Sequence, residues 1–272
     1  MKQGIFFSIS LVLVLSCLAP LAAQPNTRSI ETICIDDFDT SEGMAVADYA
    51  ARAHTSPELF AQAQPGAGSG EAAAPERWTW SINKSKFMAE NYPKWDYISG
   101  IPNSLRTLKT EAGGDPGAAK ILGIQASYTR KGDNWFEVYP SAGADGKNIE
   151  IPLTGTVSQI DFWVWGTRYR YFLEVLVRDA VGLVHIIPAG ALDFSGWKNV
   201  VVKIPAGIPQ RSRLRSGPES MNFVGFRIKS DPREYVDDFV VYFDDLKYTT
   251  NVLSNIYDGY DLRKFSSNGG AR

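Results

Sequence analysis

The chain is 272 residues long, with 44% hydrophobic residues and a formal net charge of −2. A chain of this length can hold one large all-β domain or two small ones, and we expect one main domain. The nearly balanced charge gives the surface no strong electrostatic reason to bind nucleic acid or anionic lipid, so we expect neither as a partner.

The N-terminal residues have the pattern of an export signal. Lys2 is followed by the apolar run Ile5–Leu15, and small residues up to Ala23 offer a cleavage site. The run is too short for a retained membrane span. We therefore expect residues 1–23 to be a signal peptide cleaved near Ala23, with a lipoprotein-type cut at Cys17 as the alternative. The mature chain would then keep only Cys34, which cannot form an internal disulfide, so the core must hold the fold.

The next segments contain one strand and an insertion. Residues 24–38 include Glu31–Phe38 (ETICIDDF), which is typical of a first strand. Residues 39–76 are rich in Ala, Gly and Pro, and Ser56-Pro57-Glu58 is typical of a helix start. We expect a partly helical insertion that ends in a linker at Gln64–Pro75.

Residues 77–250 have the pattern of a β-sandwich. Their expected strands are Trp78–Ile82, Ile121–Tyr128, Asn134–Tyr139, Ile149–Leu153, Ile160–Trp165, Tyr171–Val177, Leu183–Pro188, Trp197–Ile204, Phe223–Ser230 and Phe239–Tyr248, with a loop-rich stretch at Asn91–Pro116. Short strands at this spacing without alternating helices predict an all-β fold, a two-sheet antiparallel β-sandwich of jelly-roll type. Residues 251–272 are expected to be a C-terminal tail.

The clearest alternation lies at Ile160–Trp165. Ile160, Phe162 and Val164 alternate with Asp161, Trp163 and Trp165, which predicts a half-buried strand. Trp163 and Trp165 share one face of this strand. They could stack on sugars or anchor a protein contact, but we favour a position in the core between the sheets.

Signatures of catalysis are missing. The sequence has no H-E-x-x-H, no G-x-S-x-G and no phosphate-binding loop, and its two histidines, His54 and His185, are few for a proton relay. Glu137 and Glu174 lie in expected strands and could form a glycosidase pair, but carboxylates on the solvent face of a sheet have the same pattern. We expect no enzymatic activity and no cofactor.

Two acidic pairs lie near the ends of the expected domain. Asp36-Asp37 belongs to the first strand and Asp244-Asp245 to the last, and a jelly roll often places these strands side by side. Their oxygens could serve a structural calcium ion. We favour carboxylates that face water, and therefore expect no metal.

Two basic segments are candidates for contact with a protein partner. The first contains Arg168, Tyr169, Arg170 and Tyr171, and the second contains Arg211, Arg213 and Arg215. Tyr and Arg are common at interface hot spots. A solvated charged loop is the alternative for both.

The chain resembles the outer-layer, or sheath, proteins of spirochaete periplasmic flagellar filaments. The matching stretches include Trp163–Gly166, Leu173–Asp179, Leu192–Asn199, Phe223–Phe226, Asp237–Asp244 and Tyr257–Gly259. The resemblance covers most of the chain from Trp78 to Gly259, whereas the insertion from Thr40 to Pro75 has no match.

The resemblance implies an exported, non-catalytic subunit located in the periplasm. Such a subunit would coat a flagellin core beside other sheath subunits and contribute to motility. A different class of function is also compatible with the residues: a secreted carbohydrate-binding module of jelly-roll fold, because a fold does not fix a function.

Overall fold

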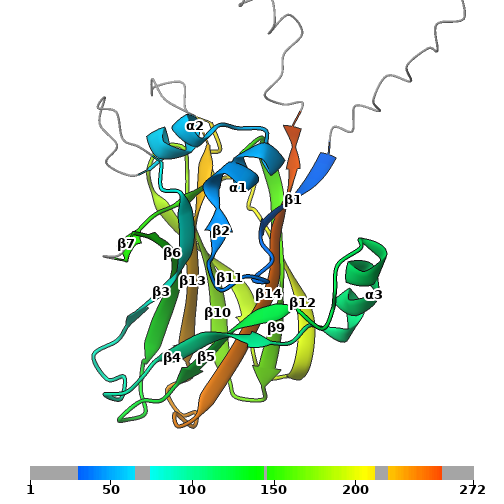
Figure 1. Cartoon of the computed structure of the whole chain (residues 1–272). Helices are drawn as coiled ribbons and strands as arrows, with labels where there is room; N and C mark the ends of the chain where they lie inside the picture. Colours follow the sequence, from blue (N-terminus) through cyan, green and yellow to red (C-terminus); the bar gives the residue numbers. More distant parts are fainter. Residues whose placement is uncertain (1–29, 65–73, 144–145, 212–219, 253–272) are drawn as a thin grey trace, which may run out of the picture.

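Two antiparallel β-sheets pack face to face and form the body of the protein (Figure 1). The computed structural model describes residues 30–64, 74–143, 146–211 and 220–252. The expected signal peptide, most of the expected linker and the tail beyond residue 252 lie outside these described residues.

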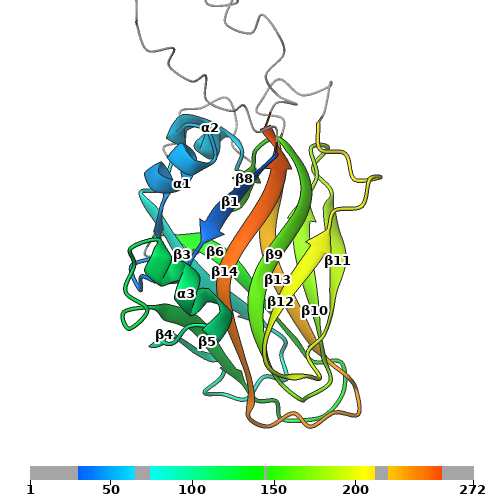
Figure 2. The same ribbon diagram turned by 90° about the vertical axis from the view of Figure 1, so that its right-hand side faces the viewer.

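One sheet has six strands in the described residues. They are β1 (Ile30–Asp36), β4 (Lys94–Ser99), β5 (Lys120–Ala126), β9 (Thr156–Thr167), β12 (Ser195–Lys203) and β14 (Phe239–Asn251). The order is β12-β9-β14-β5-β4, and β1 also pairs with β14, so the first and last strands lie side by side (Figure 2).

The other sheet has eight strands in the same described ranges. They are β2 (Met44–Ala45), β3 (Arg77–Lys84), β6 (Trp135–Ala142), β7 (Lys147–Asn148), β8 (Ile151–Leu153), β10 (Tyr171–Arg178), β11 (Val184–Ala191) and β13 (Met221–Ser230). Its main order is β11-β10-β13-β6-β3-β2. The chain passes repeatedly from one sheet to the other, for example between β5 and β6, β9 and β10, and β13 and β14. This confirms the predicted two-sheet sandwich of jelly-roll type.

Three short helices lie outside the sheets. They are α1 (Val46–Arg52), α2 (Pro57–Gln62) and α3 (Asn103–Glu111). The predicted start of α2 is confirmed, since the Ser56 hydroxyl accepts a hydrogen bond from the Leu59 N–H at 3.3 Å and Pro57 is the first helical residue. The stretch Asn91–Pro116, predicted to be rich in loops, also contains two elements that the sequence did not predict, β4 and α3.

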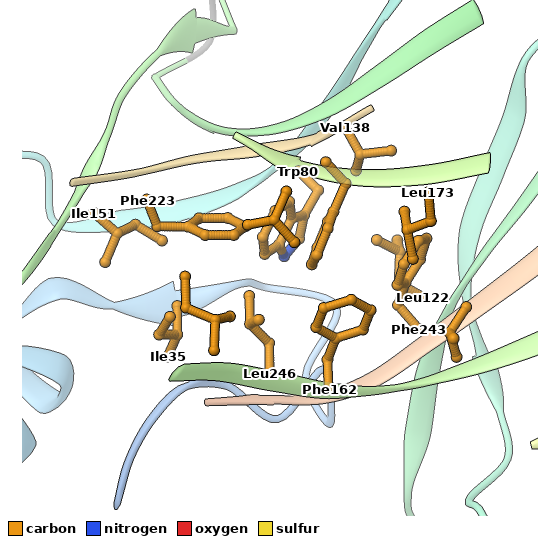
Figure 3. Packing of buried hydrophobic residues seen from close by; sticks show 14 of the residues in the cluster. Ile35, Trp80, Leu122, Val138, Ile151, Phe162, Leu173, Phe223, Phe243 and Leu246 are labelled. Carbon is orange, nitrogen blue, oxygen red and sulfur yellow. The ribbon is translucent and has the colours of Figure 1, made fainter. Parts of the chain in front are cut away.

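The core is one continuous layer between the sheets. Trp80 and Phe223 from the eight-stranded sheet face Phe162, Phe243 and other side chains from the six-stranded sheet (Figure 3). The preference for Trp163 and Trp165 as core residues was wrong. Phe162 and Val164 are fully buried, so the alternation of the strand places the two tryptophans on the outer face, where both are half-buried.

Candidate functional site

The most distinctive local feature is a bulge in the last strand. β14 pairs with β5 through Phe239–Phe243 and with β1 through Leu246–Asn251, so the two neighbours meet the same edge of β14 end to end. Asp244 and Asp245 lie at the interruption, and Asp245 has a positive φ of 50°. A bulge of this kind redirects side chains away from the regular pleat.

The bulge forms the floor of a cavity of about 330 Å³. One wall is apolar and consists of two leucines of α3 and of Ile101, two residues before the helix, and α3 lies outside the six-stranded sheet (Figures 1 and 2). The lining residues are Asp37, Asp39, Ile101, Leu105, Leu108, Lys109, Asp244, Asp245 and Lys247. We call this space the acidic cavity.

Asp244 is the most perturbed residue of the acidic cavity. Its side chain lines the space although the residue is only 5% exposed, and its Oδ1 accepts the Asp245 N–H at 2.8 Å. Burial, together with the neighbouring charge of Asp245, raises its pKa to about 8. Among the hydrogen bonds of the described residues, none reaches the other carboxylate oxygen of Asp244.

The two lysines of the cavity compensate only part of its negative charge. Lys109 on α3 pairs with Asp39 and so fixes the helix to the segment after β1. The Lys247 Nζ lies 2.5 Å from Asp245 and 3.6 Å from Asp161 on β9. Asp37 and Asp244 are left without a lysine partner among the described lining residues.

The structure brings three of the four calcium candidates to this cavity and separates the fourth. Asp36 points into the core, where its carboxylate accepts the Phe38 N–H and the Trp80 indole N–H, each at 2.8 Å. Burial raises the pKa of Asp36 to about 7. The expectation that all four carboxylates face water was therefore wrong for Asp36 and Asp244, which are 2% and 5% exposed. Within the described residues, no group of three or more His, Cys, Asp or Glu side chains is arranged to hold a metal ion.

Next to the cavity, a row of aromatic side chains crosses the outer face of the same sheet. Tyr242 of β14 lies opposite Trp165 of β9, which lies opposite Trp197 of β12. The Tyr242 ring centroid is 5.1 Å from that of Trp165 and 6.4 Å from that of Trp197. On the other side, Gly123 leaves room for Tyr242, since an added Cβ would lie 3.2 Å from the tyrosine ring. We call Tyr242, Trp165 and Trp197 the aromatic row.

The first predicted contact segment is divided between the surface and the core. Arg168 and Arg170 are exposed, and the Arg170 Nε lies 3.6 Å from an Asp231 oxygen. Tyr169 is half-buried and stacks on Tyr235. Tyr171 is fully buried, with its ring stacked at 3.8 Å on that of Phe239. Its expected role in partner contact was wrong, because a side chain inside the core cannot touch another molecule.

The second predicted contact segment can be placed only in part. Arg211 is a described residue that engages in an interaction with its surroundings. Arg213 and Arg215 lie outside the described residues.

The other candidate polar residues form ion pairs within the chain. Arg227 lies between Glu137 and Glu174 in the strand register and contacts Glu137 at 2.6 Å, while Glu174 contacts Lys229 at 2.6 Å. His185 contacts Asp179 at 2.7 Å, and His54 contacts Glu31 at 2.8 Å. Each of these residues is thus engaged in an ion pair within the chain, although one oxygen of Glu174 is buried without a hydrogen bond among the described residues.

Comparison with known proteins identifies the family. The family model described as flagellar filament outer layer protein FlaA matches residues 61–257, which is more than half of the chain. The chain belongs to the FlaA family. This confirms the resemblance found in the sequence, and the match also covers residues 61–75 of the insertion, for which the sequence analysis found no match.

Two curated FlaA relatives come from spirochaetes. A flagellar filament outer layer-like protein of Brachyspira hyodysenteriae is 32% identical over 137 residues, covering 50% of this chain and 60% of the relative. The flagellar filament outer layer protein of Treponema pallidum is 34% identical over 127 residues, covering 43% of this chain and 36% of the relative. The matched region thus spans less than two thirds of either relative.

Solved structures with a similar arrangement are distant. The carbohydrate-binding module TmCBM61, in complex with β-1,4-galactotriose, has a TM-score of 0.35 and 13% identity over 63% of this chain and 88% of the module. A likeness at this level supports no inference about function. In the described part of the FlaA chain, no helix has the length and apolar character needed to cross a membrane.

Proposed function

We propose that this FlaA-family chain is a structural subunit of the outer layer of periplasmic flagellar filaments. It would coat a flagellin core beside other sheath subunits and contribute to motility without catalysing a reaction. The observation that carries the proposal is the family match over residues 61–257. The expected export signal in residues 1–23 supports a periplasmic location.

The surface of the sandwich also supports a role in assembly. Glu137 and Glu174, the two strand carboxylates that could form a glycosidase pair, are engaged in ion pairs with Arg227 and Lys229. The outer face of the six-stranded sheet instead presents the aromatic row beside the acidic cavity. Aromatic residues beside charged groups are typical of protein contact surfaces.

Within this proposal, Arg168, Tyr169 and Arg170 remain candidates for contact with a neighbouring subunit. Arg168 is exposed and lies in the turn between β9 and β10, where it has a positive φ of 67°. Arg211 and the residues Arg213 and Arg215 stay candidates on sequence grounds alone. Many modest contacts repeated along a filament give strong attachment through multivalency.

The proposal is tested by co-sedimentation with purified periplasmic filaments from which the outer layer has been stripped. The wild-type chain should sediment with the filaments, and Arg168→Glu should reduce the bound fraction several-fold. Lys203→Glu reverses the charge of another exposed residue, at the end of β12, and should sediment like the wild type. If the wild-type chain is mixed with stripped filaments and remains in the supernatant after the filaments are sedimented, the structural role is refuted.

A second function is favoured by one observation. The aromatic row offers flat, half-buried rings on the outer face of a sheet, and such rings can stack on sugars as well as on protein side chains. A glycan array distinguishes carbohydrate binding from a role in filament assembly. Saturable glycan binding that Trp165→Ala abolishes, without filament binding, would favour a carbohydrate-binding module.

A further inference from the structure

The acidic cavity has the chemistry of a receptor for one extended cation. Four carboxylates and two lysines line it, so two negative charges lack a positive partner within the lining when all these groups are ionised. Its volume of about 330 Å³ lies at the small end of the range of about 300–1,000 Å³ that is usual for ligand sites. One side is apolar and the floor is charged, which suits a ligand with an apolar stem and a cationic end.

Asp244 supplies an independent sign that the cavity is incomplete. A carboxyl group that is only 5% exposed is normally satisfied by several donors, because burial without partners is costly. Here the Asp245 N–H is the donor that the described residues provide, and Asp244 lines the cavity. A donor from another molecule would complete the arrangement.

Arginine fits this site better than a metal ion or lysine does. The described carboxylates form no cluster suited to a metal. A guanidinium group carries five N–H donors in a planar fork and can bind more than one carboxylate at once. Its three-carbon stem can lie along the apolar wall formed by Ile101, Leu105 and Leu108.

We propose that the acidic cavity between α3 and the β14 bulge binds an arginine side chain of a neighbouring subunit. The choice of partner rests on the outer-layer function proposed above. The aromatic row lies next to the cavity, since Tyr242 and Asp244 share the outer face of β14 and Trp163 lies opposite Asp244. The aromatic row provides a surface for the residues that flank the inserted arginine.

The first arm of the test uses the isolated full chain and a small probe. Nα-acetyl-L-arginine amide should produce saturable NMR shifts at Asp244, Asp245 and the amides of α3. The matched probe Nα-acetyl-L-citrulline amide has nearly the same shape without the charge, and it should produce no saturable shift. Equal effects of the two probes would overturn the proposal, as would calcium ions that bind at these residues and displace the arginine probe.

Variants assign the binding to Asp244. Asp244→Asn keeps the oxygen that accepts the Asp245 N–H but removes the charge, and it should weaken binding of the arginine probe at least five-fold. Asp133→Asn makes the same change at an exposed residue in another turn and should bind like the wild type. Unchanged binding by Asp244→Asn, with a native thermal transition, would overturn the proposal.

The pH dependence gives a separate readout. The charged groups that face Asp244 are Asp37, Asp39, Lys109, Asp245 and Lys247, and Asp161 faces Lys247 from β9. With a pKa of about 8, Asp244 must lose a proton before it pairs with a guanidinium, so affinity should rise about tenfold between pH 7 and pH 9. Asp244→Asn should lack this rise, and a rise of equal size in the variant would contradict the assignment.

The second arm asks whether the filament supplies the arginine. Asp244→Asn should sediment with stripped filaments less than Asp133→Asn does, and excess arginine probe should release the wild type. If the probe binds but Asp244→Asn sediments like the wild type, the neighbouring subunit is the wrong source and the proposal fails. If the wild type itself does not sediment, the outer-layer function fails, whereas the probe experiment still reports on the cavity.

Discussion

Asp36 and Asp244 are two acidic residues buried at opposite faces of the six-stranded sheet. Asp36 joins the end of β1 to the core through Trp80, and Asp244 lies at the floor of the acidic cavity. Burial raises the pKa of the first to about 7 and that of the second to about 8. The folded chain therefore retains protons at these residues at pH values where the unfolded chain has released them.

These two residues predict that stability falls as the pH rises from about 4 to about 8. In this window the native state binds more protons than the unfolded state, so the free energy of unfolding decreases with pH. The groups around Asp36 include Asp37, whose charge raises its pKa further, and Arg52, whose charge lowers it. Urea unfolding at pH 5 and pH 8.5 should show the fall.

Asp244→Asn tests how much Asp244 contributes to the decrease in the free energy of unfolding between pH 5 and pH 8.5. Because the amide cannot ionise, the variant should recover about 4 kcal/mol of the loss at pH 8.5, since the folded carboxyl keeps its proton over about three pH units in which the unfolded one has lost it, at about 1.4 kcal/mol for each unit. The control Asp133→Asn should follow the wild type at both pH values. If Asp244→Asn loses as much stability between pH 5 and pH 8.5 as the wild type does, Asp244 is not the cause.

At the scale of elements, helices α1 and α2 lie at one end of the sandwich (Figure 1), and their side chains form an aromatic cluster with β3. Phe60 of α2 stacks on Trp78 of β3 with ring centroids 5.8 Å apart, and Tyr49 of α1 meets both rings edge-on. The Tyr49 hydroxyl donates a hydrogen bond to the Pro152 carbonyl at 2.5 Å. The helices thus belong to the same packed core as the sheets.

Phe60→Ala should therefore destabilise the whole fold. Removing a fully buried phenylalanine costs about 3–5 kcal/mol through lost burial and a new cavity. The control is Leu59→Ala on the same helix, where the side chain is 43% exposed and the loss should stay below about 1 kcal/mol. Chemical denaturation of both variants measures the difference, and equal losses would show that α2 does not contribute to the core.

The sequence predicts elements well where local signals are strong. The alternation at Ile160–Trp165 predicts β9, and Ser56 with Pro57 predicts the start of α2. Both faces of β9 carry large apolar residues, however, so the period of two could not tell which face is buried. Helix α3 was missed because it buries no residue, lacks a side-chain cap and has an apolar face of only two leucines, Leu105 and Leu108.

At the scale of the whole molecule, the jelly-roll pairing of the first and last strands could be predicted, but the acidic cavity could not. Asp39, Lys109 and Asp244 meet there from three distant parts of the chain. Their meeting depends on the bulge of β14 and on the end-to-end placement of β1 and β5. Neither of these features has a local sequence signal.

The continuous core predicts that the described domain unfolds in one cooperative transition. The aromatic cluster around Trp78 and the layer between the two sheets belong to one set of contacting buried residues, so neither part has a core of its own. Tryptophan fluorescence and far-UV circular dichroism should report the same urea midpoint. Phe60→Ala at the helical end and Val164→Ala between the sheets should each shift both signals together. A fluorescence change that precedes the loss of β-structure in Phe60→Ala would show instead that the helical end unfolds as a separate unit.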